Sequence, residues 1–131
     1  MEKKIFNPWK WQDDMGFAQA VEVRNAEYTL YCAGQTSVDE NGTPQHPKDM
    51  GSQINLAFDN LEKVLSHSDY KLENVVKINY FTTDMGKFYE SFGNVMERTA
   101  AKGCIASGTL VEVSKLAYPE LMIEVEAIAV K

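Results

Sequence analysis

The segment Leu121–Val130 constrains the fold more than any other part of the chain, because it is almost wholly apolar and yet carries two carboxylates. Its richness in valine and isoleucine predicts a strand. In a strand, residues i and i+2 share a face, so Glu124 and Glu126 lie beside Ile128 and opposite Val125. A buried carboxylate is costly unless it is paired, hydrogen-bonded or used in chemistry. This face of the strand therefore borders solvent, a subunit seam or a functional cleft.

A second constraint is the amphipathic pattern that follows Asp49, a residue that can cap a helix. Apolar residues recur there at steps of three and four, which gives a helix one continuous apolar stripe. The stripe consists of Met50, Ile54, Ala57, Phe58, Leu61, Val64 and Leu65. A helix with one apolar face needs a sheet or another helix to cover it, so we expect a layered core.

The remaining segments predict one further helix and four further strands. Asp84 caps the second helix, which runs roughly from Lys87 to Ala101 and ends at Gly103. The further strands cover residues 18–23, 28–32, 75–83 and 109–113. The resulting order is ββαβαββ. Because the chain lacks a regular βα alternation, we expect an α+β fold with two helices packed on one face of a mixed sheet.

Residues 1–16 show neither the helical spacing nor the strand alternation of apolar residues, although they include Trp9 and Trp11. We expect an irregular N-terminal arm there, within a single domain that spans residues 1–131. Apolar residues make up 44% of the chain and charged residues 24%, which is ordinary for a globular protein. The composition therefore argues against disorder.

The net charge of −6 disfavours attraction to nucleic acid phosphates and to anionic membranes. The N-terminus lacks the apolar core of a signal peptide, and no apolar run approaches the length of a membrane span. We therefore expect a cytoplasmic protein. Of the two cysteines, Cys32 falls in a strand and is expected to be buried, whereas Cys104 follows a glycine and is expected to be more exposed.

Several common catalytic motifs are absent. The sequence contains no GxGxxG, no GxxxxGK[ST] and no HExxH. His46 and His67 have no partner at metal-ligand spacing, so no metal site is expected. No serine stands in a nucleophile elbow. Hydrolysis by a zinc-bound water or by a Ser-His-Asp triad is thus not expected.

Seven stretches, in this order and at this spacing, resemble the Rid family (RidA/YjgF type, also called L-PSP endoribonuclease). They are Phe17–Val21, Tyr31–Gln35, Gln53–Leu61, Val75–Lys77, Phe81–Asp84, Val111–Leu116 and Ile123–Val130. The resemblance covers nearly the whole chain after residue 15. It implies a chorismate-mutase-like fold and a homotrimer with small-molecule clefts between its subunits. It also implies hydrolysis of reactive enamines and imines, such as 2-aminoacrylate, to a 2-keto acid and ammonia, without a cofactor.

The residues that the family uses are only partly present. Gly108 stands where deaminating members have an arginine that grips the substrate carboxylate, and Phe17 replaces a tyrosine. Glu124 matches the glutamate that positions the attacking water, so it is the expected catalytic residue. The expected binding residues are Phe17, Gly34, Gln35, Phe92, Gly108 and Thr109. Glu112 and Glu126 remain alternatives to Glu124 for the acid that faces the cleft.

The missing arginine leaves three functions open. The chain resembles an enamine or imine deaminase of the hydrolase class, whose substrate would be larger or less anionic than 2-aminoacrylate. Gly108 would enlarge the pocket, and Lys115 or Arg98 would be candidate replacement cations. Alternatively, the trimer binds a small molecule or a partner without turnover. Ribonuclease action or translation inhibition ranks third, because a basic face and a histidine pair are absent.

Overall fold

The computed structural model describes the whole chain, residues 1–131. The elements, in chain order, are β1 (Glu2–Phe6), β2 (Ala20–Arg24), β3 (Thr29–Tyr31), β4 (Gln35–Thr36), α1 (Met50–His67), η1 (Leu72–Asn74), β5 (Val75–Thr82), α2 (Met85–Glu90), α3 (Phe92–Arg98), η2 (Ala100–Lys102), β6 (Leu110–Glu112) and β7 (Ile123–Val130). Both η elements are short 3₁₀ turns. No helix is both long and apolar enough to cross a membrane.

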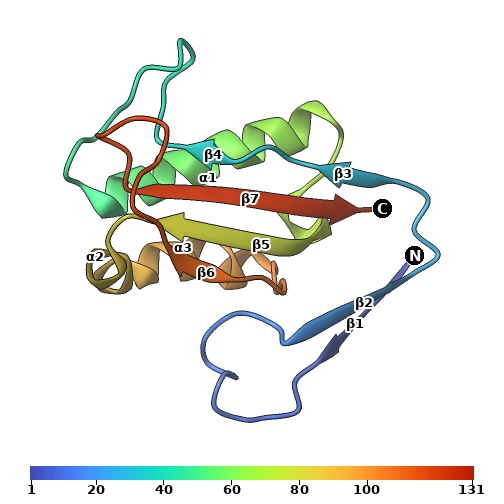
Figure 1. Cartoon of the computed structure of the whole chain (residues 1–131). Helices are drawn as coiled ribbons and strands as arrows, with labels where there is room; N and C mark the ends of the chain where they lie inside the picture. Colours follow the sequence, from blue (N-terminus) through green and yellow to red (C-terminus); the bar gives the residue numbers. More distant parts are fainter.

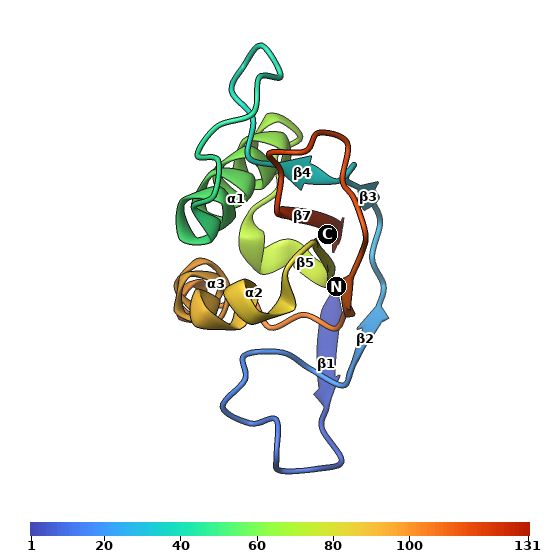
Figure 2. The same cartoon turned by 60° about the vertical axis from the view of Figure 1, so that its left-hand side comes forward.

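The main sheet is built around β7. Its strand order is β3–β7–β5–β6, and β4 also pairs with β7. The β7 strand runs antiparallel to β3, β4 and β5, whereas β5 and β6 are parallel, so the sheet is mixed. The three α-helices lie together on one face of the sheet (Figures 1 and 2). The predicted α+β class and the one-sided helical layer are confirmed.

The α1 helix begins as its sequence predicts. The Asp49 carboxylate accepts a hydrogen bond from the backbone N–H of Ser52 at 3.1 Å, which satisfies one of the free donors at the helix start. The predicted apolar stripe is buried except for Val64, which is half-buried. The polar residue Gln53 is fully buried as well. Its amide satisfies three backbone groups, the carbonyls of His46 and Glu120 and the N–H of Met122.

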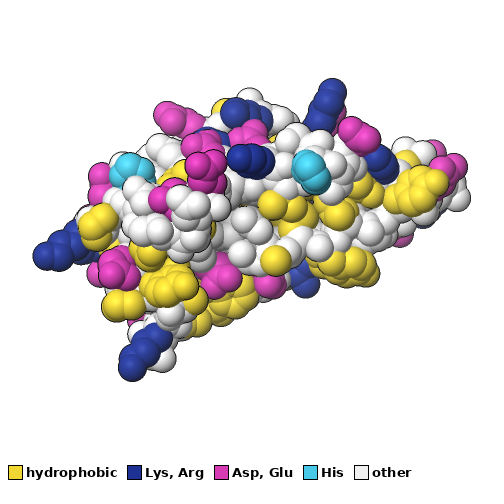
Figure 3. Space-filling view, turned by 90° about the horizontal axis from the view of Figure 1, so that it is seen from above, with side chains coloured by type: hydrophobic (Ala, Val, Ile, Leu, Met, Phe, Trp, Pro, Cys, Tyr) yellow, Lys and Arg dark blue, Asp and Glu magenta, His cyan; other side chains and the backbone are white.

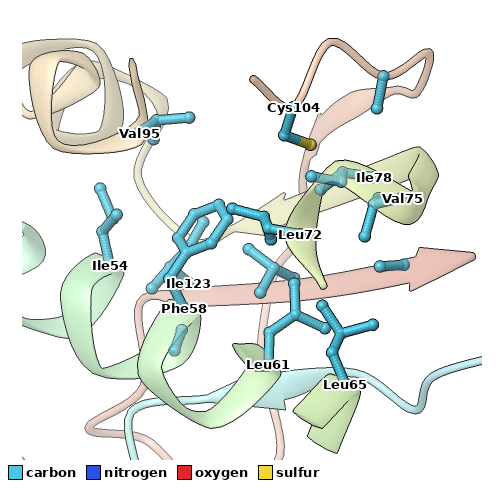
Figure 4. Close-up of a cluster of buried hydrophobic side chains, with 14 of the residues drawn as sticks. Ile54, Phe58, Leu61, Leu65, Leu72, Val75, Ile78, Val95, Cys104 and Ile123 are labelled. Carbon is cyan, nitrogen blue, oxygen red and sulfur yellow. The ribbon is translucent and has the colours of Figure 1, made fainter. Parts of the chain in front are cut away.

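The core lies between the helices and the sheet. It is one cluster of 19 buried residues, to which α1, β5 and β7 contribute most. Figure 4 shows Phe58 and Leu61 of α1 directed towards Ile123 of β7 and Leu72. Alternation along β7 is clear, because Ile123 and Val125 are buried while Glu124 is half-buried on the other face. The sequence-based assignment of the two faces of this strand is confirmed.

The second helix differs from the continuous helix predicted for Lys87–Ala101. It begins earlier, at Met85, where Asp84 accepts from the N–H of Lys87 at 3.0 Å. It is then interrupted at Ser91, so that α2 and α3 are separate segments. The backbone leaves helical geometry at Ser91, with φ −106° and ψ 15°, so the helix breaks although the apolar spacing continues across it.

The N-terminal segment is also more regular than predicted. Residues 2–6 form β1, which pairs antiparallel with β2 in a separate hairpin. Oppositely charged residues face each other across this pair, Glu2 opposite Arg24 and Lys4 opposite Glu22. Such cross-strand pairs stabilise a ladder, and they explain why a segment without an apolar pattern becomes a strand. The irregular part of the arm is therefore the loop that follows, which carries both tryptophans.

The two cysteines are placed opposite to expectation. Cys104 is buried, whereas Cys32 is only half-buried. The segment after η2 turns back beneath the helices, and the Cys104 N–H donates to the Thr99 carbonyl at 3.0 Å. The neighbouring carbonyl of Ala106 accepts from the N–H of Ala18 at 3.0 Å. These contacts draw what looked like an exposed loop into the interior.

Candidate functional site

Glu124 lies on the helix-free face of the main sheet. It sits between Thr36 of β4 and Phe81 of β5, its two partners in the antiparallel ladders. Its carboxylate stands over Gly34, since a Cβ built on that glycine would lie 2.0 Å from Glu124 Oε1. Any other residue at position 34 would displace the carboxylate. The sequence-predicted residues Gly34, Gln35 and Glu124 are thus brought together at one place.

The Glu124 carboxylate has no partner within the chain. It forms no ion pair, and no side chain or backbone N–H donates to it. Burial raises the pKa of Glu124, and the neighbouring charge of Glu126 raises it further. An unpaired, partly desolvated carboxyl group stays protonated to a higher pH than an ordinary surface glutamate.

The other two candidate acids are engaged elsewhere. Glu126 Oε1 accepts a hydrogen bond from Asn79 Nδ2 at 3.0 Å, and Asn79 Oδ1 in turn accepts from the N–H of Thr109 at 3.0 Å. Glu112 Oε1 accepts from the N–H of Met85 at 2.9 Å, at the start of α2. Both therefore have structural partners. Among Glu112, Glu124 and Glu126, only Glu124 is free.

A cavity of about 290 Å³ opens on the other side of β5 and β6, among the N-terminal loop, α2 and α3. Its lining includes four of the sequence-predicted residues, Phe17, Phe92, Gly108 and Thr109. It does not include Gly34, Gln35 or Glu124. Within one copy of the chain, the predicted site is therefore divided into two half-sites, an acidic one and an apolar one.

Gly108 cannot carry a side chain in this backbone. A Cβ at that position would lie 1.7 Å from the carbonyl oxygen of Ile78. The strand pairing is irregular here, because Ile78 N–H donates to the Ser107 carbonyl whereas Thr109 N–H turns to the Asn79 side chain. The space of the missing side chain is filled by the β5 backbone. The expectation that Gly108 enlarges the pocket is therefore wrong.

Neither of the two candidate cations reaches the cavity within one copy of the chain. Arg98 is fixed on the far side of α3, where it pairs with Asp59 and Glu62 of α1 and donates to the carbonyl of Asn55. Neither Arg98 nor Lys115 lines the cavity. No group of three or more His, Cys, Asp and Glu side chains is placed to hold a metal ion. A role for Arg98 is disfavoured by its pairing with α1, and a role for Lys115 stays a prediction.

Sequence reasoning missed most of the cavity wall. Trp11 and Met15 enter from the N-terminal loop, and Tyr80 and Cys104 line the interior. Trp11 and Phe17 contact each other, with ring centroids 6.3 Å apart. The two tryptophans of the arm were the one available signal, but only the folded chain shows which of them meets the cavity.

Fold and site together define a small α+β protein with an apolar cavity on the helical side of the sheet and a free acid on the helix-free face. The chain belongs to the Endoribonuclease L-PSP family, the Rid family, whose sequence profile matches residues 13–131. Among curated relatives, the RutC family protein YjgH of Escherichia coli is 30% identical over 98 residues, which cover 75% of this chain and 73% of YjgH. The RutC family protein BU371 of Buchnera aphidicola is 28% identical over 88% of this chain and 87% of its own length.

Solved structures agree with this assignment. YyfB of Yersinia pestis, a Rid-family protein of unknown function, has a TM-score of 0.87 at 27% identity, and all of both chains is covered. Yeast Mmf1 has a TM-score of 0.71 at 25% identity, covering 88% of this chain and 86% of Mmf1. The yeast protein is named as a mitochondrial protein. Family membership therefore does not determine the location in the cell, and the cytoplasmic location of this chain stays a prediction.

Proposed function

We propose that this protein hydrolyses a C=N or enamine bond to a carbonyl group and ammonia, with Glu124 as the catalytic acid–base. The observation that carries the proposal is the free, half-buried Glu124 carboxylate held over Gly34. Water adds its oxygen to the C=N carbon while Glu124 accepts a proton from it and returns a proton to the nitrogen. The resulting carbinolamine collapses to the carbonyl and releases ammonia. A carboxyl with a raised pKa is suited to moving a proton in both directions.

The complete site, in this proposal, forms between copies in a homotrimer. The acid and the cavity are separate half-sites within one chain, and a second copy can set the cavity of one subunit against the Glu124 of its neighbour. Two observations support assembly. Tyr31 on the helix-free face is 74% exposed, and the β1–β2 hairpin packs neither face against the main core. An isolated two-stranded hairpin is marginally stable in water, so a covering partner is expected.

The substrate would not be a small α-imino acid. A fixed arginine orients a carboxylate by two parallel hydrogen bonds, and Gly108 offers none. The cavity that Gly108 borders contains no cationic side chain. A less anionic and more apolar imine fits the half-site better than 2-aminoacrylate.

The test is a panel of imines generated in place by amino acid oxidases, with formation of the carbonyl product followed over time. We expect acceleration over buffer, and we expect Glu124→Gln to reduce it by 100-fold or more, on the order of general acid–base catalysis. Glu40→Gln is the control, because it removes an exposed carboxylate in a turn outside both half-sites and should retain turnover. An unchanged rate for Glu124→Gln would contradict the proposal, as would a panel without any acceleration beside an active RidA.

A second candidate function is ligand or partner binding without turnover. The observation that favours it is the close backbone contact at Gly108, which leaves the family's anion-gripping position without a side chain. Saturable binding of carbonyl compounds, unaffected by Glu124→Ala and unaccompanied by turnover, would support this candidate. Loss of a measured turnover in Glu124→Ala would exclude it.

Ribonuclease action ranks third, despite the name of the family. The net charge of −6 opposes RNA binding, and on the face seen in Figure 3 acidic side chains lie among the basic ones. RNA binding without sequence preference needs a groove of positive charge with stacking aromatic residues. Digestion of a defined RNA that persists through repeated purification would overturn this ranking.

A further inference from the structure

The cavity beside α2 and α3 has a lining that selects against charge. Thirteen of its 18 lining residues are hydrophobic, and none is Asp, Glu, Lys, Arg or His. An ion placed there would lose its hydration without gaining a counter-ion. Burying even a neutral polar group without a hydrogen bond costs on the order of 2–7 kcal/mol, and burying an ion costs more. The cavity therefore suits an uncharged group.

The size of the cavity limits what that group can be. A water molecule occupies about 30 Å³ in the liquid, so 290 Å³ accommodates about ten non-hydrogen atoms. This is the size of one aromatic ring with a short substituent. Ligand pockets commonly begin at about 300 Å³, so the cavity lies at the small end of that range.

Aromatic side chains line the cavity on both the loop side and the helical side. Trp11 and Phe17 meet at an interplanar angle of 58° on the loop side. Phe88 and Phe92 meet with centroids 6.0 Å apart on the helical side. Tilted ring pairs present faces and edges to which a further ring can pack at 4.5–7 Å, a geometry worth about 0.5–1.5 kcal/mol beyond area burial.

The loop that carries Trp11 is held in place from within. Gln12 is fully buried, and its Nε2 donates to Asn7 Oδ1 and to the Phe17 carbonyl, each at 2.9 Å. These bonds tie the two ends of the loop together. They position the loop backbone beside the cavity, and the Trp11 side chain, 64% exposed, lies at its mouth.

One polar group inside the cavity lacks a partner. The hydroxyls of Thr99 and Ser107 are already bound, to the carbonyls of Val95 at 2.8 Å and Val76 at 3.1 Å. The Tyr80 hydroxyl forms no hydrogen bond within the chain, and the half-buried side chain lines the cavity beside Phe88. Burial raises the pKa of Tyr80, so the hydroxyl remains a neutral donor at all physiological pH values.

We infer that this cavity binds the uncharged aromatic part of a small ligand, with Trp11 as the specificity-determining wall and the Tyr80 hydroxyl as donor to one acceptor atom of that ligand. The inference rests on the proposed function in so far as this ligand is the apolar portion of the imine substrate. It extends the proposed function by assigning the substrate class, which is a neutral arylalkyl imine or its carbonyl product.

The test measures binding and not turnover. Phenylacetamide, phenylacetate and phenethylamine have nearly the same shape and differ in charge. Titration calorimetry of the full chain at pH 7 should give phenylacetamide a dissociation constant at least about tenfold lower than that of the other two. Trp11→Ala should weaken phenylacetamide by about tenfold. Trp9→Ala is the matched control, because Trp9 is a similarly exposed tryptophan of the same loop that does not line the cavity.

Tyr80→Phe tests the polar anchor while keeping the ring and the fold. It should weaken phenylacetamide several-fold and leave the binding of ethylbenzene unchanged, because only the amide needs the hydroxyl. Equal binding of phenylacetate and phenylacetamide, tightest binding of phenethylamine, equal effects of Trp11→Ala and Trp9→Ala, or no saturable binding would each overturn the inference. Binding as described without imine hydrolysis would overturn only the proposed function.

Discussion

The two faces of the main sheet differ in how far one chain completes them. On the helical face, α1 and α3 enclose a core in which Phe58 and Ile123 have no exposed surface. On the other face, Tyr31 is 74% exposed and Glu124 is half-buried without a partner. The contrast teaches that the buried core lies on the helical face, whereas the proposed catalytic acid lies on the helix-free face.

The largest effect that tests this contrast is the removal of a ring from the helical face. Phe58→Ala should lower the free energy of unfolding by about 3–5 kcal/mol, because the fully buried ring leaves a cavity that its neighbours cannot fill. Denaturant titration at low protein concentration measures it. Tyr31→Ala on the open face is the control.

Tyr31→Ala should change the free energy of unfolding by less than about 0.5 kcal/mol when copies are kept apart by dilution. Its cost should grow with protein concentration if the open face is covered by a second copy. A cost for Tyr31→Ala as large as that for Phe58→Ala at every concentration would remove the distinction between the two faces.

The edge of the sheet offers a sharper test at Gly108. Gly108→Ala should destabilise the fold by about 2–3 kcal/mol, because the new Cβ meets the Ile78 carbonyl and forces two backbone segments apart. Gly93→Ala in α3 should have the opposite sign, a gain of about 0.5–1 kcal/mol, because no atom lies within 4 Å and alanine favours a helix. Thermal unfolding of both variants and of the parent chain measures these two changes in stability. Two variants of equal stability would show that Gly108 is not held against β5.

The features that could be predicted from the sequence are those that depend on contacts between residues close together in the chain. The apolar period of α1 and the alternation of β7 are local signals, and both were sufficient to predict the helical layer and the two faces of the strand. The β1 strand was missed because its pairing depends on charges near Arg24, far along the chain. The separation of α2 from α3 is a change of backbone geometry at Ser91, which the continuous apolar spacing did not indicate.

The candidate site was predictable only in part, for the same reason. Glu124 and Gly34 were identified by resemblance, and their proximity in the structure is consistent with it. That Glu124 is free while Glu126 is bound depends on Asn79, a residue of a neighbouring strand with no motif around it. Likewise, the unpaired hydroxyl of Tyr80 becomes visible only when the whole cavity wall is known.

The smallest expected effect concerns the acid itself and separates function from stability. Burial and the charge of Glu126 raise the pKa of Glu124 in the folded chain. Between its ordinary pKa and this raised value, the folded state binds more protons than the unfolded state, so stability falls as pH rises through that window. Glu124→Gln removes this loss. It should therefore stabilise the fold at pH 7.5 and leave it unchanged at pH 3.5, where both forms are protonated.

The expected gain is about 0.5 kcal/mol or less, since solvent screens a half-exposed carboxylate. For a chain of this size it corresponds to a rise of about 1–2 °C in Tm. Calorimetric scans at the two pH values measure it, with Glu40→Gln in an exposed turn as the control that should shift at neither pH. A gain of equal size at both pH values would trace the effect to packing and not to charge. A loss at pH 7.5 would mean that the ionised carboxylate has a stabilising partner, and the free acid that the proposed catalysis requires would not exist.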